Sequence, residues 1–176
     1  MARVILTLVG DDRPGLTELL ASAIAQAGGN WLESRLSALG GHYVGSVLVE
    51  LPGDAVSKLR LAADAAGANG LKIHLIEARG NDDAPGTLVD LEIVGQDRPG
   101  IVREVTAALS RIGVNIQELS TAVENSSWSG APLFRAEATL LLPAGVAEEA
   151  VRHALEQISG EIMVDFALQP ASARED

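Results

Sequence analysis

The sequence contains one short junction twice, and this repeat constrains the fold more than any other feature. Residues 10–15 (the first junction) read GDDRPG and residues 95–100 (the second junction) read GQDRPG, an offset of 85 positions. The same offset aligns apolar, turn and polar residues outside the junctions: Val4 with Val89, Leu6 with Leu91, Gly28 with Gly113 and Asn30 with Asn115. A constant offset over this length indicates a duplicated unit, so we expect two tandem domains.

Each unit shows the same order of strand and helix patterns. In the first unit, apolar periodicity predicts strands at 3–9, 30–39, 42–51 and 71–78 and helices at 14–27 and 54–68. In the second unit it predicts strands at 88–94, 115–124, 133–142 and 161–168, one helix that starts at residue 99 and another at 145–159. The order βαββαβ is that of the ferredoxin-like split fold. We therefore predict an α+β protein of two tandem ferredoxin-like units, each a four-stranded antiparallel sheet with two helices on one face.

Turn-rich stretches set the expected boundaries. We expect a first domain at residues 1–79, a polar linker at 80–86, a second domain at 87–168 and a flexible tail at 169–176. Gly40 and Gly41 predict a two-residue hairpin. The corresponding hairpin of the second unit, residues 125–132, is six residues longer and contains Trp128. Trp128 either anchors a partner or folds back on its own sheet.

The junctions also predict how the first helix of each unit begins and ends. Pro14 fits the first helical turn, where the amide that proline lacks has no intrahelical partner. Asp12 and Asp97 are expected to cap the helix or to complement the positive end of its dipole. Gly28 and Gly113 stand where a left-handed residue ends a helix.

Composition and charge exclude several classes of protein. The chain has no cysteine, which excludes disulfides and thiolate chemistry and is typical of a reducing compartment. Because it shows no signal sequence and no apolar segment of membrane length, we expect a cytoplasmic protein without membrane contact. The net charge is -11, and residues 81–176 carry 6 basic against 16 acidic side chains. Without a basic cluster, direct binding to nucleic acid is not expected.

The sequence contains no recognisable catalytic constellation. The three histidines, His42, His74 and His153, fall in different predicted elements and lack the spacing of a metal site or a triad. The serines of the long hairpin have no nucleophile-elbow context. We therefore expect a protein that is not an enzyme and that has no catalytic residue, cofactor or metal.

A strand, then Asp-Arg-Pro-Gly, then a helix that ends in Gly-x-Asn before a second strand resembles the ACT domain, a small-molecule regulatory module of amino-acid metabolism. The resemblance covers nearly the whole chain, twice. The tandem units without a catalytic domain, and the long hairpin that ends in Ala131-Pro132-Leu133-Phe134, are similar to the glycine cleavage system transcriptional repressor family. The resemblance implies a regulatory homo-oligomer that binds a free amino acid and acts through a protein partner, such as a transcription factor.

The resemblance also implies where the ligand binds. In ACT domains, free amino acids bind near the junction and at the asparagine that opens the second strand, commonly at an interface between units. Glycine at a helix start permits a close approach of the backbone, exposed amides favour a carboxylate, and an asparagine amide both donates and accepts. The candidates carried over are Asp11, Asp12, Gly15 and Asn30 in the first unit, and Gln96, Asp97, Gly100 and Asn115 in the second.

The same residues permit a purely structural interpretation. Pro-Gly after an aspartate is an ordinary helix start, and asparagine after glycine is an ordinary turn residue. In addition, Asp11 corresponds to Gln96 and Trp31 to Ile116, so the two sites need not bind the same molecule. The alternative function is an interaction or oligomerisation module without a functional ligand site.

Overall fold

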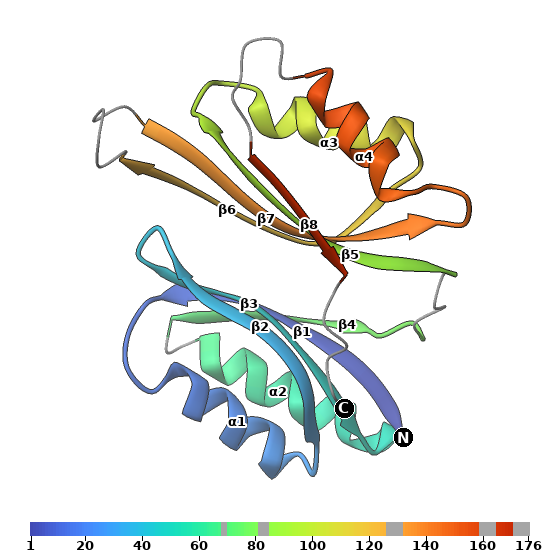
Figure 1. Cartoon of the computed structure of the whole chain (residues 1–176). Coiled ribbons are helices and arrows are strands. Elements are labelled where there is room, and N and C mark those ends of the chain that lie inside the picture. The colour runs from blue at the N-terminus through green and yellow to red at the C-terminus, as the bar shows by residue number, and fades with distance from the viewer. Residues whose placement is uncertain (68–69, 81–84, 126–131, 159–164, 171–176) are drawn as a thin grey trace. The chain divides into compact units, whose positions relative to one another are not determined.

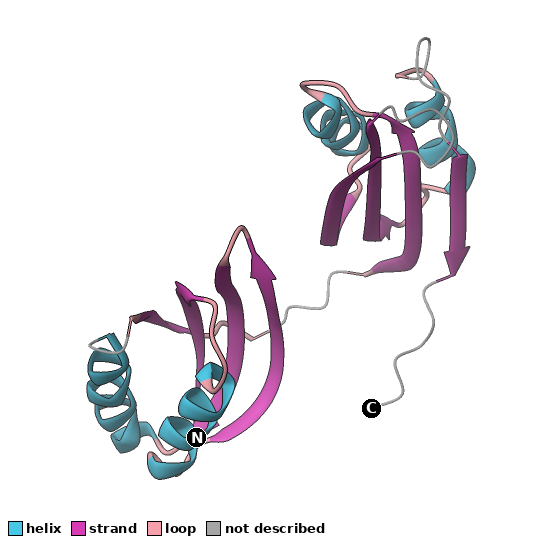
Figure 2. Cartoon of the chain, turned by 90° about the vertical axis from the view of Figure 1, so that its left-hand side faces the viewer, coloured by secondary structure: helices cyan, strands magenta, loops and turns pink. Residues whose placement is uncertain are grey.

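A computed structural model describes residues 1–67, 70–80, 85–125, 132–158 and 165–170. For residues 125 and 165–170 the description is limited to the backbone. The chain divides into two compact units, Met1–Asn81 and Asp82–Asp176. Each unit has the predicted α+β architecture, a four-stranded antiparallel sheet with two helices on one face (Figures 1 and 2).

In the first unit, β1 (Ala2–Asp11) leads through the first junction to α1 (Leu16–Gln26). The hairpin of β2 (Asn30–Leu39) and β3 (His42–Leu51) follows, and then a 3-10 turn (Gly53–Ala55), α2 (Val56–Gly67) and β4 (Leu71–Glu77). The strand order is β2-β3-β1-β4 and all pairs are antiparallel. The sheet edges are therefore β2 and β4.

The second unit repeats this topology with β5 (Gly86–Gln96), α3 (Ile101–Arg111), β6 (Asn115–Asn125), β7 (Pro132–Pro143), α4 (Glu148–Glu156) and β8 (Asp165–Pro170). Its strand order is β6-β7-β5-β8. The edge strand β6 therefore corresponds to β2.

Alternation along the central strands places the core between each sheet and its helices. In β1 the side chains of Val4, Leu6 and Leu8 are buried and pack with Leu20 and Ile24 of α1. Each such side chain stabilises the fold by roughly 1.5–3 kcal/mol relative to an exposed one. The second core is built in the same way, from residues that include Val89, Leu91, Ile93, Leu109 and Val151.

The helices that follow the junctions begin two residues later than the first prediction. They start at Leu16 and Ile101, because Gly15 (φ 91°) and Gly100 (φ 92°) adopt a left-handed conformation that no helical turn contains. These glycines occupy the N-cap position and no side chain caps either helix, so the prediction of an aspartate cap is wrong. The left-handed conformation predicted for Gly28, where α1 ends, is confirmed by its φ of 75°.

The short hairpin is as predicted, since Gly40 and Gly41 both have positive φ, as a type I′ turn requires. The long hairpin and Trp128 lie outside the described residues, as do most of the linker and residues 171–176. The helix expected at 145–159 is shorter, at Glu148–Glu156, and the last strand extends two residues beyond its expected end, to Pro170.

Both edge strands that follow the first helix of a unit contain a β-bulge. The register shifts between Trp31 and Glu33 in β2, and between Ile116 and Glu118 in β6. One extra residue, Leu32 in β2, is therefore unpaired at that point of the ladder. The bulge places Trp31 and Ile116 on the same face of the sheet as the helices.

Candidate functional site

Backbone contacts fix the shape of the first junction. At the end of β1, Asp11 pairs with His42 of β3, and the amide of Asp12 donates to the carbonyl of Gly41 over 3.1 Å. After the left-handed Gly15, the buried side chain of Leu16 anchors the start of α1 in the core. The turn between them is therefore held at both ends.

An open hollow of about 400 Å³ lies at this turn and is called here the junction hollow. Its wall on the strand side is Tyr43 of β3, whose hydroxyl lies 2.7 Å from the Thr17 hydroxyl of α1. The hollow is lined by Asp12, Arg13, Pro14, Gly15, Leu16, Thr17 and Tyr43. Of the predicted residues, Asp12 and Gly15 thus meet in one place.

The junction hollow has the electrostatics that a zwitterion requires. The first helical hydrogen bond runs from the Leu19 amide to the Gly15 carbonyl, 2.9 Å. The amides of Leu16, Thr17 and Glu18 precede it and have no intrahelical acceptor. Together with the helix dipole they favour a carboxylate, while the Asp12 carboxylate attracts an ammonium group.

Asp11 does not belong to the hollow. Because Gly10 faces the helices, the next side chain points to the opposite face of the sheet. There the Asp11 carboxylate, 89% exposed, lies 3.3 Å from Nδ1 of His42. A direct ligand contact of Asp11 at the junction hollow is therefore not supported.

Asn30 lies at the far end of the sheet from the junction. Asn30 is opposite Glu50 of β3, and Glu50 is opposite Arg3 of β1. Asp11 of the first junction lies eight residues further along β1 than Arg3. At about 3.3 Å per residue the separation is about 26 Å. In the second unit Asn115 and Gln96 are separated in the same way. One unit alone does not bring its asparagine to its own junction.

The second junction carries an ion pair at its own helix. The Arg98 guanidinium donates two hydrogen bonds to the Glu104 carboxylate of α3, one of them 3.0 Å long from Nη1 to Oε1. This hydrogen bond lowers the pKa of Glu104 below its ordinary value. In the first unit Leu19 occupies the position of Glu104, and the acidic residue in the first turn of α1 is Glu18.

The predicted residues of the second junction lie at the chain segment between β5 and α3. Gln96 is exposed at the end of β5, and the Asp97 amide donates to the Pro132 carbonyl over 3.1 Å. Gly100 repeats the left-handed conformation of Gly15. The two junctions thus share a backbone and differ in side chains.

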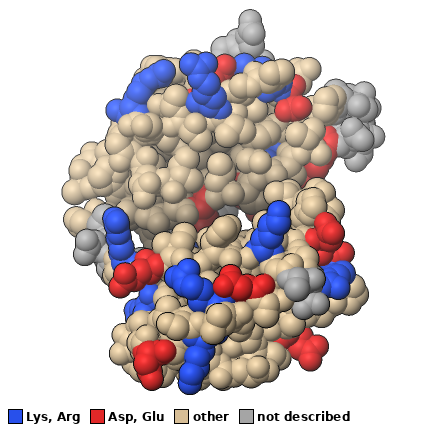
Figure 3. All heavy atoms as spheres, turned by 180° about the vertical axis from the view of Figure 1, so that it is seen from behind, with Lys and Arg blue, Asp and Glu red and all other residues tan. Residues whose placement is uncertain are grey.

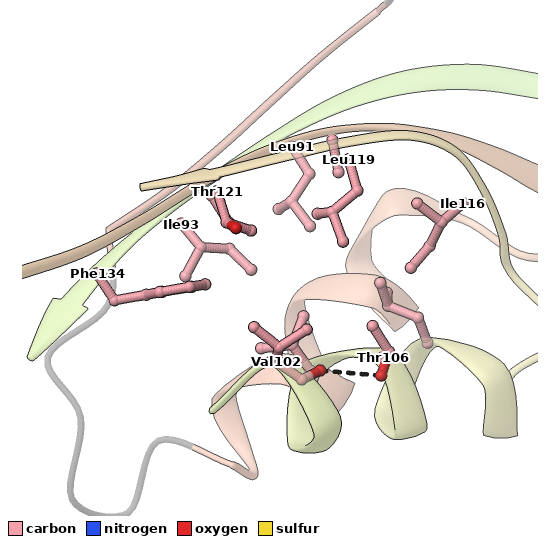
Figure 4. Close-up of a pocket in the computed structure, with 12 residues that line it drawn as sticks. Leu91, Ile93, Val102, Thr106, Ile116, Leu119, Thr121 and Phe134 are labelled. Carbon is pink, nitrogen blue, oxygen red and sulfur yellow. Dashed lines mark hydrogen bonds between the residues drawn. The ribbon is translucent and has the colours of Figure 1, made fainter. Parts of the chain in front are cut away.

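The second unit has an apolar cleft between α3 and the sheet, next to the edge strand β6 (Figure 4). Side chains from α3, β5, β6 and β7 converge on it, and its enclosed part measures about 10 Å³. It is lined by Leu91, Ile93, Val102, Val105, Thr106, Leu109, Ile116, Leu119, Thr121, Phe134, Ala136 and Ala138. Neither this cleft nor the residues Thr17 and Tyr43 were predicted, because strand pairing brings them together from distant parts of the sequence.

The described residues were also compared with the requirements of a metal site and of a membrane span. No group of three or more His, Cys, Asp or Glu side chains in this part of the chain could hold a metal ion. None of the described helices has the length and apolar character of a membrane span. On the face seen in Figure 3, Lys and Arg are interspersed with Asp and Glu.

Comparison with known proteins agrees with this architecture. An unknown protein from Galdieria sulphuraria has a structure with a TM-score of 0.84 at 29% identity, covering 97% of this chain and 99% of that one. A candidate glycine cleavage system transcriptional repressor has a TM-score of 0.72 at 16% identity, with coverage of 96% and 98%. At that identity the second likeness concerns the fold alone. No protein of curated function matches the chain significantly.

The family comparison covers both units. The ACT domain model matches residues 2–75 and again residues 88–166, so each match contains one junction and the strands and helices around it. The predicted resemblance to ACT domains is thereby confirmed. Because the two matches span most of the sequence, the chain belongs to the ACT domain family.

Proposed function

We propose that the chain is a regulatory protein without catalytic activity that binds a free amino acid and passes its occupancy to a protein partner in the cytoplasm. The observation that carries this proposal is the junction hollow. There, the helix start at Gly15 offers amides to a carboxylate and Asp12 offers a carboxylate to an ammonium group. Both ends of an amino acid thus have a complementary group within one hollow.

The regulatory output passes through protein rather than nucleic acid. Residues 81–176 carry 10 more acidic than basic side chains, counted as 16 against 6. Such a surface repels phosphates, which supply most of the binding energy in protein–nucleic acid complexes. If the chain controls transcription of amino-acid metabolism, it does so by binding a transcription factor.

The place of Asn30 supports a site shared by two copies of the chain. Asn30 opens the edge strand β2, and the other end of β2 lies beside the junction, since Leu39 is opposite His42 and His42 is opposite Asp11. Antiparallel pairing of β2 with β2 of a second copy would set Asn30 of one copy next to the junction of the other. A homo-oligomer would then contain two equivalent sites related by symmetry.

Calorimetric titration of the full chain with a panel of free amino acids tests this function. Asp12→Ala is expected to weaken binding about 10- to 100-fold, because it removes a charged hydrogen-bond partner. Asn30→Ala is expected to weaken it as well, while Asp54→Ala, an acidic residue away from the junction, serves as the control. Absence of binding by every amino acid, with the circular dichroism spectrum intact, would refute the proposal in favour of a plain interaction module.

Mixing the two variants tests the shared site. If Asp12 and Asn30 of different copies form one site, a mixture of Asp12→Ala and Asn30→Ala chains regains intact sites in mixed dimers. Random exchange in an equal mixture would restore about a quarter of the sites, because half of the dimers are mixed and each has one intact site. No recovery after exchange, checked by native mass spectrometry, would contradict the shared site and leave amino-acid binding itself untouched.

A further inference from the structure

We propose that the outer edge of β6 in the second unit binds an extended segment of the protein partner in which aliphatic and basic residues alternate. The segment would add to the four-stranded sheet as a further strand. In this mode of recognition, main-chain hydrogen bonds supply affinity and alternate side chains supply specificity. The inference rests on the proposed function, because it states the chemistry of the partner through which the chain acts.

The backbone of β6 is available for such pairing. β6 ends the strand order β6-β7-β5-β8, and in the described part of the chain no strand lies beside its outer edge. Because its bulge lies between Ile116 and Glu118, the ladder with β7 is regular over residues 118–124. Residues 119–124 are all exposed. This stretch of edge strand is therefore open to an added strand.

The side of β6 that faces the helices exposes aliphatic carbon. Leu119 is 45% exposed and Val123 is 59% exposed, with Thr121 between them on the same side of the strand. Val102 of α3, 41% exposed, lies across the apolar cleft from Leu119 (Figure 4). A strand paired with β6 would place every second side chain against these groups. Aliphatic side chains at those positions would remove the exposed carbon from water.

The opposite side of β6 carries negative charge. Glu118 and Glu124 point to the helix-free face of the sheet, because side chains alternate along a strand. The carboxylates on this face of β5, β6 and β7 belong to Asp90, Glu92, Glu118, Glu124 and Glu137. Among the described side chains of these three strands on that face, Arg135 is the only cation; it donates to Glu92, and its Nε lies 3.7 Å from Oε1 of Glu124. Basic side chains of an added strand would therefore meet opposite charge.

The same charges disfavour a second copy of β6 as the occupant. Antiparallel pairing of residues 118–124 with the same stretch of another chain would place Leu119 opposite Val123. It would also place Glu118 opposite Glu124, twice by symmetry. Like charges directly opposite each other destabilise a strand pair. A partner strand with basic residues has no such conflict.

The edge strand of the first unit has neither feature. The two aliphatic positions of β6 correspond to Ser34 and Ala38 in β2. The two acidic positions correspond to Leu39 and to Glu33, which forms an ion pair with Arg35. Pairing of residues 33–39 with the same stretch of another chain would set Glu33 opposite Leu39, without repulsion. β2 therefore suits the symmetrical pairing proposed above, whereas β6 suits a basic partner.

Titration of the full chain with synthetic peptides tests this inference. The probe is Lys-Val-Lys-Val-Lys-Val-Lys, which matches residues 118–124 in length and sets its valines on the aliphatic side of β6 in either strand direction. Lys-Lys-Val-Val-Val-Lys-Lys has the same composition without alternation, and Glu-Val-Glu-Val-Glu-Val-Glu reverses the charge. The alternating basic peptide is expected to bind at least about tenfold more tightly than either control. In its presence, hydrogen–deuterium exchange should fall in proteolytic fragments from β6 and not in those from β2.

Substitutions in β6 separate the two kinds of contact. Glu118→Lys combined with Glu124→Lys replaces two attractions by two repulsions and should lower the affinity for the alternating basic peptide at least about tenfold. Leu119→Ser introduces the residue of the first unit and should lower that affinity several-fold, because less carbon is buried. Glu33→Lys combined with Asp54→Lys makes the same change of net charge in the first unit. This matched control should leave peptide binding unchanged.

The outcomes separate this inference from the proposed function. Amino-acid binding without any peptide binding would overturn the partner chemistry alone. Equal binding of the alternating basic peptide and its non-alternating control, or protection of β2 in place of β6, would overturn the assignment to this edge. Protection of β6 in the free protein that rises with chain concentration would identify a second copy as the occupant and overturn it as well. Peptide binding at β6 without amino-acid binding would support the interface and refute only the ligand of the proposed function.

Discussion

The left-handed glycine of each junction gives a quantitative test of the fold. In Gly15→Ala and Gly100→Ala the new methyl group meets no heavy atom within 4 Å, so the cost is one of backbone conformation alone. An L-residue in the left-handed region costs about 1–2 kcal/mol. Against this, alanine restricts the unfolded chain and so offsets about 0.4–1 kcal/mol. We expect a net loss of about 1 kcal/mol in the free energy of unfolding of the unit that carries the substitution, or a fall in Tm of about 4–8 °C.

Because the two units need not unfold together, the assay must resolve them. Hydrogen–deuterium exchange with mass spectrometry does so, through peptides from β1 and β3 for the first unit and from β5 and β7 for the second. Gly15→Ala should raise exchange in the first set and Gly100→Ala in the second. Each variant is the other's control.

Gly53→Ala provides the matched control for the conformation itself. Its new methyl group also meets nothing within 4 Å, but Gly53 does not have positive φ. This variant should be neutral or stabilising by up to about 1 kcal/mol. Two results would refute the reasoning. One is no difference between Gly15→Ala and Gly53→Ala, which would mean that the junction relaxes freely. The other is a loss above about 3 kcal/mol, which would mean that the space is not open.

Two further substitutions probe other features. Gly45→Ala places a methyl group 2.0 Å from the Arg35 carbonyl oxygen, so it should force β2 and β3 apart. The free energy of unfolding, measured with urea, should fall by about 3 kcal/mol or more. A much smaller fall would contradict the register of that hairpin. Glu104→Gln removes a carboxylate whose pKa Arg98 lowers in the folded protein. The ionised carboxylate therefore stabilises the fold at any pH above the pKa of Glu104 in the unfolded chain. This stabilisation is lost as the pH falls through the pKa of Glu104 in the folded protein. The free energy of unfolding of the variant should therefore be lower than that of the parent at pH 7. This difference between parent and variant should disappear at a pH below the ordinary range of the glutamate pKa. A difference that stays constant across pH would rule out the ion pair as its cause.

Patterns of short range were enough to predict the fold. In β5 the apolar residues Val89, Leu91 and Ile93 alternate with Asp90 and Glu92. The glycines that the short hairpin turn needs, Gly40 and Gly41, are adjacent in the sequence to the strands that they join. The start of the first helix was misjudged because Pro14 suits a helical turn and a type of tight turn equally well. What decides between them is the left-handed Gly15, whose conformation depends on the whole junction.

The candidate site was only partly predictable. Asp12 and Gly15 adjoin in the chain, so a local motif finds them both. Tyr43 joins them only through the pairing of β1 with β3, and no local signal marks it. Asn30 was grouped with the junction by resemblance, and counting the register then places it about 26 Å away in its own sheet.

The bulge at Leu32 has a consequence for the solubility of the chain. A regular edge strand offers its free amides and carbonyls to any other strand, which is the common route to fibrous aggregates. In β2 the regular ladder is interrupted at this residue, and β6 has the same interruption after Ile116. A strand added at this edge could form regular backbone hydrogen bonds only beyond the bulge, over less than the full length of the edge strand. Both edge strands therefore allow limited pairing between two chains, and they resist the repeated addition of strands that leads to fibrous aggregation.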